Sequence, residues 1–98
     1  MERNRSSNSI TDDIERIIDY LKSIGCSEIY LFGSAAEGHA SETSDLDFAV
    51  RGIPANKFFA VYGEVLNRSS RPVDLIDLDL QANFGRRILS NPNVRRVA

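Results

Sequence analysis

The sequence of 98 residues has no tryptophan, one methionine and one cysteine, and its apolar runs are short. The single Cys26 excludes an intramolecular disulfide, and the absence of a cluster of Cys and His residues excludes a structural zinc site. No run approaches the ~18 apolar residues of a transmembrane helix, and the polar N-terminal segment does not resemble a signal peptide. We therefore expect a cytoplasmic protein that does not interact with a membrane.

Neither sign of charge is in large excess. Lys and Arg number 12 and Asp and Glu number 14, which gives a net charge of -2. This balance provides no general attraction to nucleic acid, so we expect no direct nucleic-acid binding and only local sites for phosphate. Four arginines towards the C-terminal end fit either a solvated surface or a small basic patch. They are Arg86, Arg87, Arg95 and Arg96.

The pattern of apolar and polar residues predicts one domain. Residues 1–9 are interpreted as a disordered polar arm and residues 10–98 as the domain. Apolar residues at helical spacing predict a first helix that is capped by Thr11 or Asp12 and ends at Gly25. The further predicted elements are a strand at 28–32, a polar loop at 33–44, a strand at 45–51, a helix after Pro54, a strand at 73–78, and a helix around 80–88 that is capped by Asp79 or Asp77.

This order of elements, α-β-loop-β-α-β-α, predicts an α/β (α+β) fold with a small mixed three-stranded sheet and flanking helices. The polar loop returns the second strand antiparallel to the first, and the helix before the third strand makes that strand parallel to the second. The end of the first strand and the starts of the other two therefore meet at one end of the sheet.

Polar residues gather at this end. Asp45 and Asp47 alternate onto one face of the second strand, and Asp74 lies near the start of the third. Two carboxylates on one strand face either lie in water, which is the common case for an isolated D-x-D, or are neutralised by a cation. Here Gly33 and Ser34 end the preceding strand, where N–H groups and a hydroxyl can bind an anion. Oxygen ligands beside an anion site favour Mg²⁺ with a nucleoside triphosphate.

The segment GSAAEGHASETSDLDFAV resembles the G-S-x(9)-S/T-D-x-D signature of the DNA polymerase β nucleotidyltransferase superfamily, in the compact form called minimal nucleotidyltransferases. The resemblance continues through PVDLIDLD and covers nearly the whole domain. It implies the nucleotidyltransferase fold, with Gly33 and Ser34 binding the nucleotide. It also implies that Asp45, Asp47 and Asp74 are catalytic and hold two Mg²⁺ ions, with ATP as the substrate.

Compact members of this family resemble the antitoxin of HEPN-MNT toxin-antitoxin pairs. The resemblance implies transfer of AMP to a hydroxyl, that of a tyrosine, on a HEPN-like toxin protein. A homo-oligomer is the other assembly that we consider. Glu37 stands where many compact members have an arginine. An acid facing the phosphates would weaken binding of the nucleotide, so the alternative is a catalytically weak or inactive antitoxin that neutralises its partner by binding. His39 fits either an exposed position or a role near the phosphates.

Overall fold

The computed structural model describes residues 9–38 and 45–98. Residues 1–8 of the expected arm, and His39 with the rest of 39–44, lie outside the described residues. The elements are α1 (Ile10–Ser23), β1 (Glu28–Phe32), β2 (Leu46–Arg51), the short 3-10 helix η2 (Ala55–Lys57), α2 (Phe58–Asn67), β3 (Val73–Asp77), α3 (Ala82–Leu89) and β4 (Arg95–Arg96).

The sheet has the strand order β3-β2-β1-β4. As predicted, β1 and β2 are antiparallel and β2 and β3 are parallel. The fourth strand, β4, was not predicted: it pairs antiparallel with β1, with Arg96 opposite Tyr30 and Arg95 opposite Leu31. Two arginines in succession show no alternation of apolar residues, so only the backbone pairing with β1 reveals this strand.

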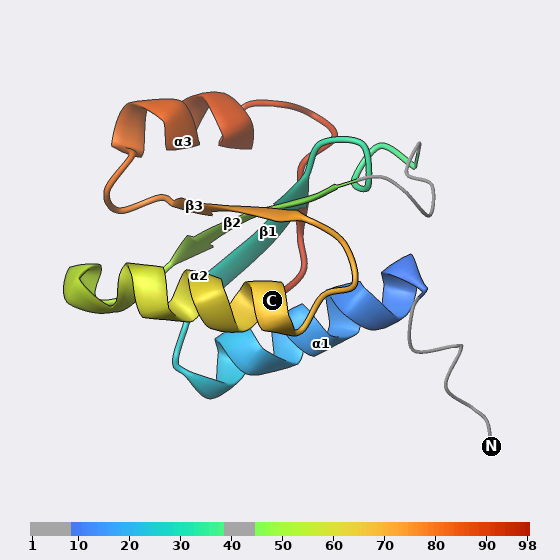
Figure 1. Ribbon diagram of the computed structural model, residues 1–98. Helices are drawn as coiled ribbons and strands as arrows, with labels where there is room; N and C mark the ends of the chain where they lie inside the picture. The colour runs from blue at the N-terminus through green and yellow to red at the C-terminus, as the bar shows by residue number, and fades with distance from the viewer. Residues whose placement is uncertain (1–8, 39–44) are drawn as a thin grey trace, which may run out of the picture.

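Helices cover both faces of the sheet. Figure 1 shows α1 and α2 on one face and α3 on the other. The larger core lies between the sheet and the first two helices, and it includes the fully buried Ile17, Leu21 and Phe48. A smaller cluster of Ala49, Leu78 and Ile88 lies on the face of α3. None of the described helices is long and apolar enough to cross a membrane.

The first helix starts earlier than predicted and ends where predicted. Ser9 is the N-cap, and its hydroxyl accepts a hydrogen bond of 3.0 Å from the Asp12 N–H. The prediction of Thr11 or Asp12 as the cap was wrong, since both lie in the first turn of the helix. There the carboxylate of Asp12 interacts favourably with the helix dipole. Gly25 follows the C-cap residue Ile24 with a φ of +96°, so the predicted glycine terminator is confirmed.

The connection from β3 to α3 is also capped differently from the prediction. Gln81, not Asp79 or Asp77, is the N-cap residue of α3, and its side chain makes no capping hydrogen bond. Asp79 instead accepts hydrogen bonds from the Gly52 N–H at 3.0 Å and from Arg51 at 3.3 Å. The Oδ1 atom of Asp77 accepts from the Asp79 N–H at 2.9 Å, so this side chain shapes the turn before the helix.

Candidate functional site

The chain makes consecutive turns directly after β1. Gly33 has a φ of +74°, a conformation that favours glycine. Its carbonyl accepts a hydrogen bond of 3.2 Å from the Glu37 N–H, and the Ala35 carbonyl accepts one of 3.4 Å from the Gly38 N–H. Ser34 is partly buried within these turns, whereas Glu37 is exposed. The structure thus turns the acidic side chain of Glu37 to solvent.

Gly33 lies against Asp47 of the neighbouring strand. Phe32, the last residue of β1, is the register partner of Asp47 in β2. A Cβ atom built on residue 33 would lie 2.1 Å from Oδ2 of Asp47, closer than any side chain can approach. The backbone conformation favours glycine here, and any side chain at residue 33 would displace the Asp47 carboxylate, which in the structure lies against the turn.

Asp47 and Asp74 form a carboxylate pair across two strands. They are register partners in the parallel ladder of β2 and β3, so both side chains project from the same face. The pKa of Asp47 is raised to about 6 by burial, by the charge of Asp74 and a hydrogen bond with it, and by the charge of Asp45. The proximity of these negative charges is the physical reason that a cation or a proton is favoured at this position.

Asp45 lies just before β2 and is exposed. Within the described residues, no group of three or more His, Cys, Asp or Glu side chains is gathered as a ready-made metal site. The closely spaced acids are Asp47 and Asp74, and Mg²⁺ is commonly held by one or two carboxylates together with substrate phosphates. The donor set therefore fits Mg²⁺ with ligands completed by a substrate, and the charge repulsion at Asp47 supports this fit.

Among residues 9–38 and 45–98, the face that carries the acids is covered by α3 at the end of the strands away from the acids. Further along β2, Ala49 is fully buried in the small cluster beneath α3. Asp47 is only partly buried and Asp74 is exposed. The strand starts therefore leave their acidic side chains accessible to a second molecule, while the strand ends are packed.

Other residues considered from the sequence have local roles. Cys26 is partly buried, and burial, together with the charge of Asp77, raises the pKa of its thiol, which disfavours the reactive thiolate. Arg86 hydrogen-bonds Asn83 within α3. Arg96 lies 6.0 Å from the ring centroid of Tyr30, and it donates a hydrogen bond of 2.9 Å to the Ala98 carbonyl.

Two residues with extensive polar contacts were not singled out from the sequence. Asp13 of α1 is fully buried and forms an ion pair of 2.8 Å with Arg71, whose side chain is 4% exposed. A carboxylate at a position four residues before the buried Ile17 was a possible signal, because that position lies on the apolar side of the helix. A partner from the segment before β3 was not predictable from spacing.

Comparison with known proteins identifies the family. The family described as Polymerase beta, Nucleotidyltransferase matches residues 15–94, a range that includes the turn after β1 and all three predicted acids. No curated protein sequence matches the chain significantly.

Two similar solved structures come from toxin-antitoxin systems. One is a mutant of the toxin-antitoxin MntA-HpeT, with a TM-score of 0.69 and 22% identity over 87% of this chain and 71% of that chain. The other is a toxin-antitoxin with AMP-PNP, with a TM-score of 0.56 and 28% identity over 66% of this chain and 56% of that chain. The similarity to the MntA-HpeT structure supports the fold, and the match of the family to residues 15–94 establishes the family. The chain belongs to the polymerase beta nucleotidyltransferase family.

Proposed function

We propose that the protein is a Mg²⁺-dependent nucleotidyltransferase that transfers AMP from ATP to a hydroxyl group of a partner toxin, and so acts as an antitoxin. The observation that carries this proposal is the pair of Asp47 and Asp74 beside the Gly33 turn, in a chain of this family. The likeness to two toxin-antitoxin structures, one of them with AMP-PNP, supports the partner class and the nucleotide.

In this proposal each residue of the site has a defined role. The turn from Gly33 and the hydroxyl of Ser34 bind the phosphates of ATP. Asp45, Asp47 and Asp74 would hold two Mg²⁺ ions, which would neutralise charge on the phosphates and lower the pKa of the acceptor hydroxyl. A carboxylate at the exposed position of Asp74 also suits a general base for the hydroxyl proton. The hydroxyl oxygen bonds to the α-phosphate, and pyrophosphate leaves.

The acceptor is proposed to be a protein because Asp74 lies exposed on β3, at one edge of the sheet. A hydroxyl on the surface of a second protein reaches such a position without entering a deep cavity. A tyrosine hydroxyl of a HEPN-like toxin is the specific acceptor that we propose. The partner then also completes the binding site for ATP.

A second candidate function is neutralisation of the toxin by binding alone. Glu37 favours this alternative, because it replaces a positive charge on the turn that would bind phosphates. Its exposure places the charge in solvent, where screening reduces the repulsion of a bound phosphate. The exposed position of Glu37 therefore weakens the case for an inactive protein.

The two functions separate in a labelling experiment. ATP labelled at the α-phosphate is incubated with Mg²⁺, the purified protein and a co-expressed HEPN-like toxin, and label is expected on a toxin tyrosine. Asp74→Asn is expected to stop labelling, whereas Asp19→Asn, an exposed acid of α1, preserves it. Toxin silenced without label, and equally by Asp74→Asn, would establish binding alone. Efficient transfer to a small molecule by the protein without a partner would contradict both functions.

A further inference from the structure

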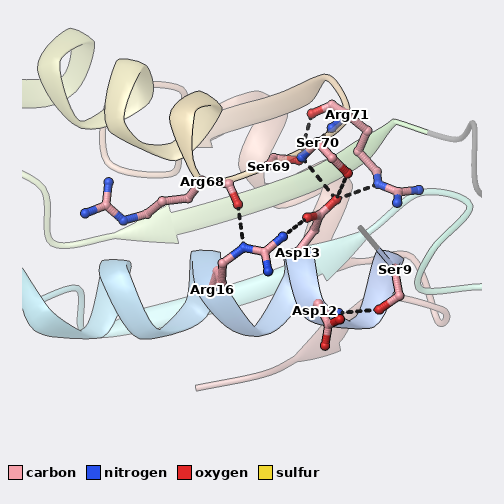
Figure 2. Close-up of polar contacts among 8 residues, drawn as sticks. All are labelled: Ser9, Asp12, Asp13, Arg16, Arg68, Ser69, Ser70 and Arg71. Atoms are coloured by element: carbon pink, nitrogen blue, oxygen red, sulfur yellow. Dashed lines mark hydrogen bonds and ion pairs between the residues drawn. The ribbon is translucent and has the colours of Figure 1, made fainter. Parts of the chain in front are cut away.

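A buried ionic cluster joins α1 to the segment before β3. Asp13 is fully buried, and its Oδ2 atom accepts hydrogen bonds from Arg71 Nε at 2.8 Å, from the Ser70 hydroxyl at 2.7 Å and from the Ser70 N–H at 3.2 Å. Its Oδ1 atom pairs with Arg16. Figure 2 shows these groups converging on the one carboxylate. Asp13 thus binds three polar groups of the neighbouring residues Ser70 and Arg71, more than 50 residues away in the sequence.

The same segment is held by further contacts. Arg16 Nε donates a hydrogen bond of 3.0 Å to the Arg68 carbonyl, which Figure 2 also shows. The Ser69 hydroxyl accepts from the Arg71 N–H at 3.1 Å and donates to the Arg71 carbonyl at 2.7 Å. These bonds leave the backbone from 68 to 71 little freedom relative to α1.

The segment passes directly into the candidate site. The Pro72 carbonyl accepts a hydrogen bond of 3.0 Å from the Leu46 N–H, at the start of β2. Val73 is the register partner of Leu46, and Asp74 is therefore the partner of Asp47. Two residues separate the amide of Ser70 from the point where β3 joins β2, so a restraint on Ser70 and Arg71 is a restraint on this register.

The two apolar residues on the buried face of β3, Val73 and Leu75, hold this register only in part. Among the described strands, β3 is at the edge of the sheet and pairs with β2. A slip by one residue would turn Val73 and Leu75 away from the core, which burial opposes. A slip by two residues keeps alternate side chains on the same face, yet it moves Asp74 by about 7 Å along β2, since a strand rises ~3.3 Å per residue. Contacts outside the ladder add to the cost of this second slip: the Tyr62 hydroxyl of α2 donates a hydrogen bond of 2.8 Å to the Val73 carbonyl, and Asp13 holds the segment just before β3.

We propose that Asp13 is a positioning residue for the carboxylate pair. By holding Ser70 and Arg71, it sets the register at which β3 joins β2 and so places Asp74 beside Asp47. Buried ion pairs contribute little net stability compared with apolar packing, but in some proteins they select one arrangement over its alternatives. This inference rests on the proposed function for its effect on catalysis, while the effect on strand register is independent of any activity.

The test uses Asp13→Asn in the full chain. Amide hydrogen exchange, followed by NMR, is expected to accelerate at least tenfold at Leu46, whose N–H donates to Pro72, beyond the change in amides between β1 and β2. In the labelling assay with the partner, kcat is expected to fall at least tenfold. The KM for ATP is expected to rise less than kcat falls, because Asp74 is only one of the proposed Mg²⁺ ligands and the turn from Gly33 belongs to β1 and not to β3.

Two further variants make the result decisive. Arg51→Gln breaks the ion pairs of 3.3 Å with Glu28 and Asp79 at the other end of β2, and it is expected to lower stability without changing Leu46 exchange or kcat. Ser70→Ala removes one hydrogen bond to Asp13 and is expected to act in the same direction as Asp13→Asn, but less strongly. If Asp13→Asn does not fold, the exchange of Leu46 and the kcat of Ser70→Ala test the positioning role of Asp13.

The outcomes separate the inference from the proposed function. Equal acceleration of exchange in all ladders, or a kcat that stays at the wild-type value despite lower stability, as expected for Arg51→Gln, would overturn the positioning role. A wild-type protein that transfers no nucleotide, but whose Leu46 amide still responds selectively to Asp13→Asn, would refute the proposed activity and leave the control of strand register established.

Discussion

Gly33 and Asp47 are in contact because residue 33 has no side chain: a Cβ atom there would lie 2.1 Å from Oδ2 of Asp47. The first prediction follows from this contact. Gly33→Ala is expected to weaken binding of ATP with Mg²⁺ at least tenfold in calorimetry, because the new methyl group displaces the carboxylate. The positive φ adds a loss of about 1–2 kcal/mol in the free energy of unfolding.

Gly25→Ala is the matched control for this change. Gly25 also has a positive φ, +96°, but a Cβ atom there would meet no atom within 4 Å. Its substitution is expected to reproduce the loss of stability without changing the affinity for ATP. Equal affinities of Gly33→Ala and wild type would show that Asp47 does not take part in nucleotide binding.

Much of the fold was predictable from local patterns. The spacing of apolar residues gave the three helices, and the alternation around Phe48 gave β2 with its two faces. The connection lengths predicted the antiparallel and parallel pairings, which the structure confirms. The two-residue strand β4 was missed because Arg95 and Arg96 lie in it through backbone pairing alone. The Ser9 cap was missed because several capping residues stand in succession.

The candidate site was predictable to the extent that it depends on strand order. Asp47 and Asp74 meet because a parallel ladder brings the two strand starts together, and this follows from a helix between the strands. The contact of Gly33 with Asp47 and the ion pair of Asp13 with Arg71 depend on tertiary packing. The spacing of the signature places Gly33 and Asp47 at the same end of the sheet, but it does not show how closely they approach. The pairing of Asp13 with Arg71 has no spacing signal at all.

The carboxylate pair leads to a prediction about stability without ligand. Asp74→Asn is expected to raise the free energy of unfolding at pH 8 by about 1 kcal/mol, because it removes a negative charge beside Asp47. At pH 5, below the raised pKa of about 6, Asp47 is mostly protonated, so the gain is expected to shrink. Urea denaturation at both pH values measures the difference.

Mg²⁺ is expected to stabilise the wild-type protein more than Asp74→Asn, which reverses the order of stability expected at pH 8 without a ligand. A cation that binds the folded wild type raises its Tm, whereas Asp74→Asn offers one fewer carboxylate and is expected to respond less. Asp19→Asn, which changes an exposed acid of α1, is the control and is expected to behave as wild type in every condition.

The prediction for pH 8 without a ligand has its own contradicting outcome. Loss of stability in Asp74→Asn under that condition would mean that the hydrogen bond with Asp47 outweighs the repulsion.

The exposed Glu37 gives a prediction about phosphate affinity. Its N–H donates to the Gly33 carbonyl, so the side chain belongs to the same turn as the proposed phosphate site. Glu37→Arg is expected to lower the Kd for ATP about fivefold at low salt, equivalent to about 1 kcal/mol, and less at high salt. Asp19→Arg makes the same change in net charge on α1 and is expected to leave the Kd unchanged. No effect of Glu37→Arg at low salt would contradict this prediction and show that the side chain at position 37 does not act on the phosphates.

The buried Asp13 gives a prediction about acid stability. Burial alone would raise its pKa, but hydrogen bonds from Arg71 and Ser70 and the charge of Arg16 outweigh burial, so the pKa is lowered. A lowered pKa means that the unfolded state binds the proton more tightly, and the stabilising contribution is complete above the ordinary pKa of 3.8 and lost as pH falls through the folded value. Asp13→Asn is therefore expected to lower the free energy of unfolding by about 3 kcal/mol at pH 7, and by progressively less below about pH 4. Urea denaturation of both proteins from pH 7 to pH 3 measures this difference, and a difference that grows on acidification would contradict the direction of the pKa shift.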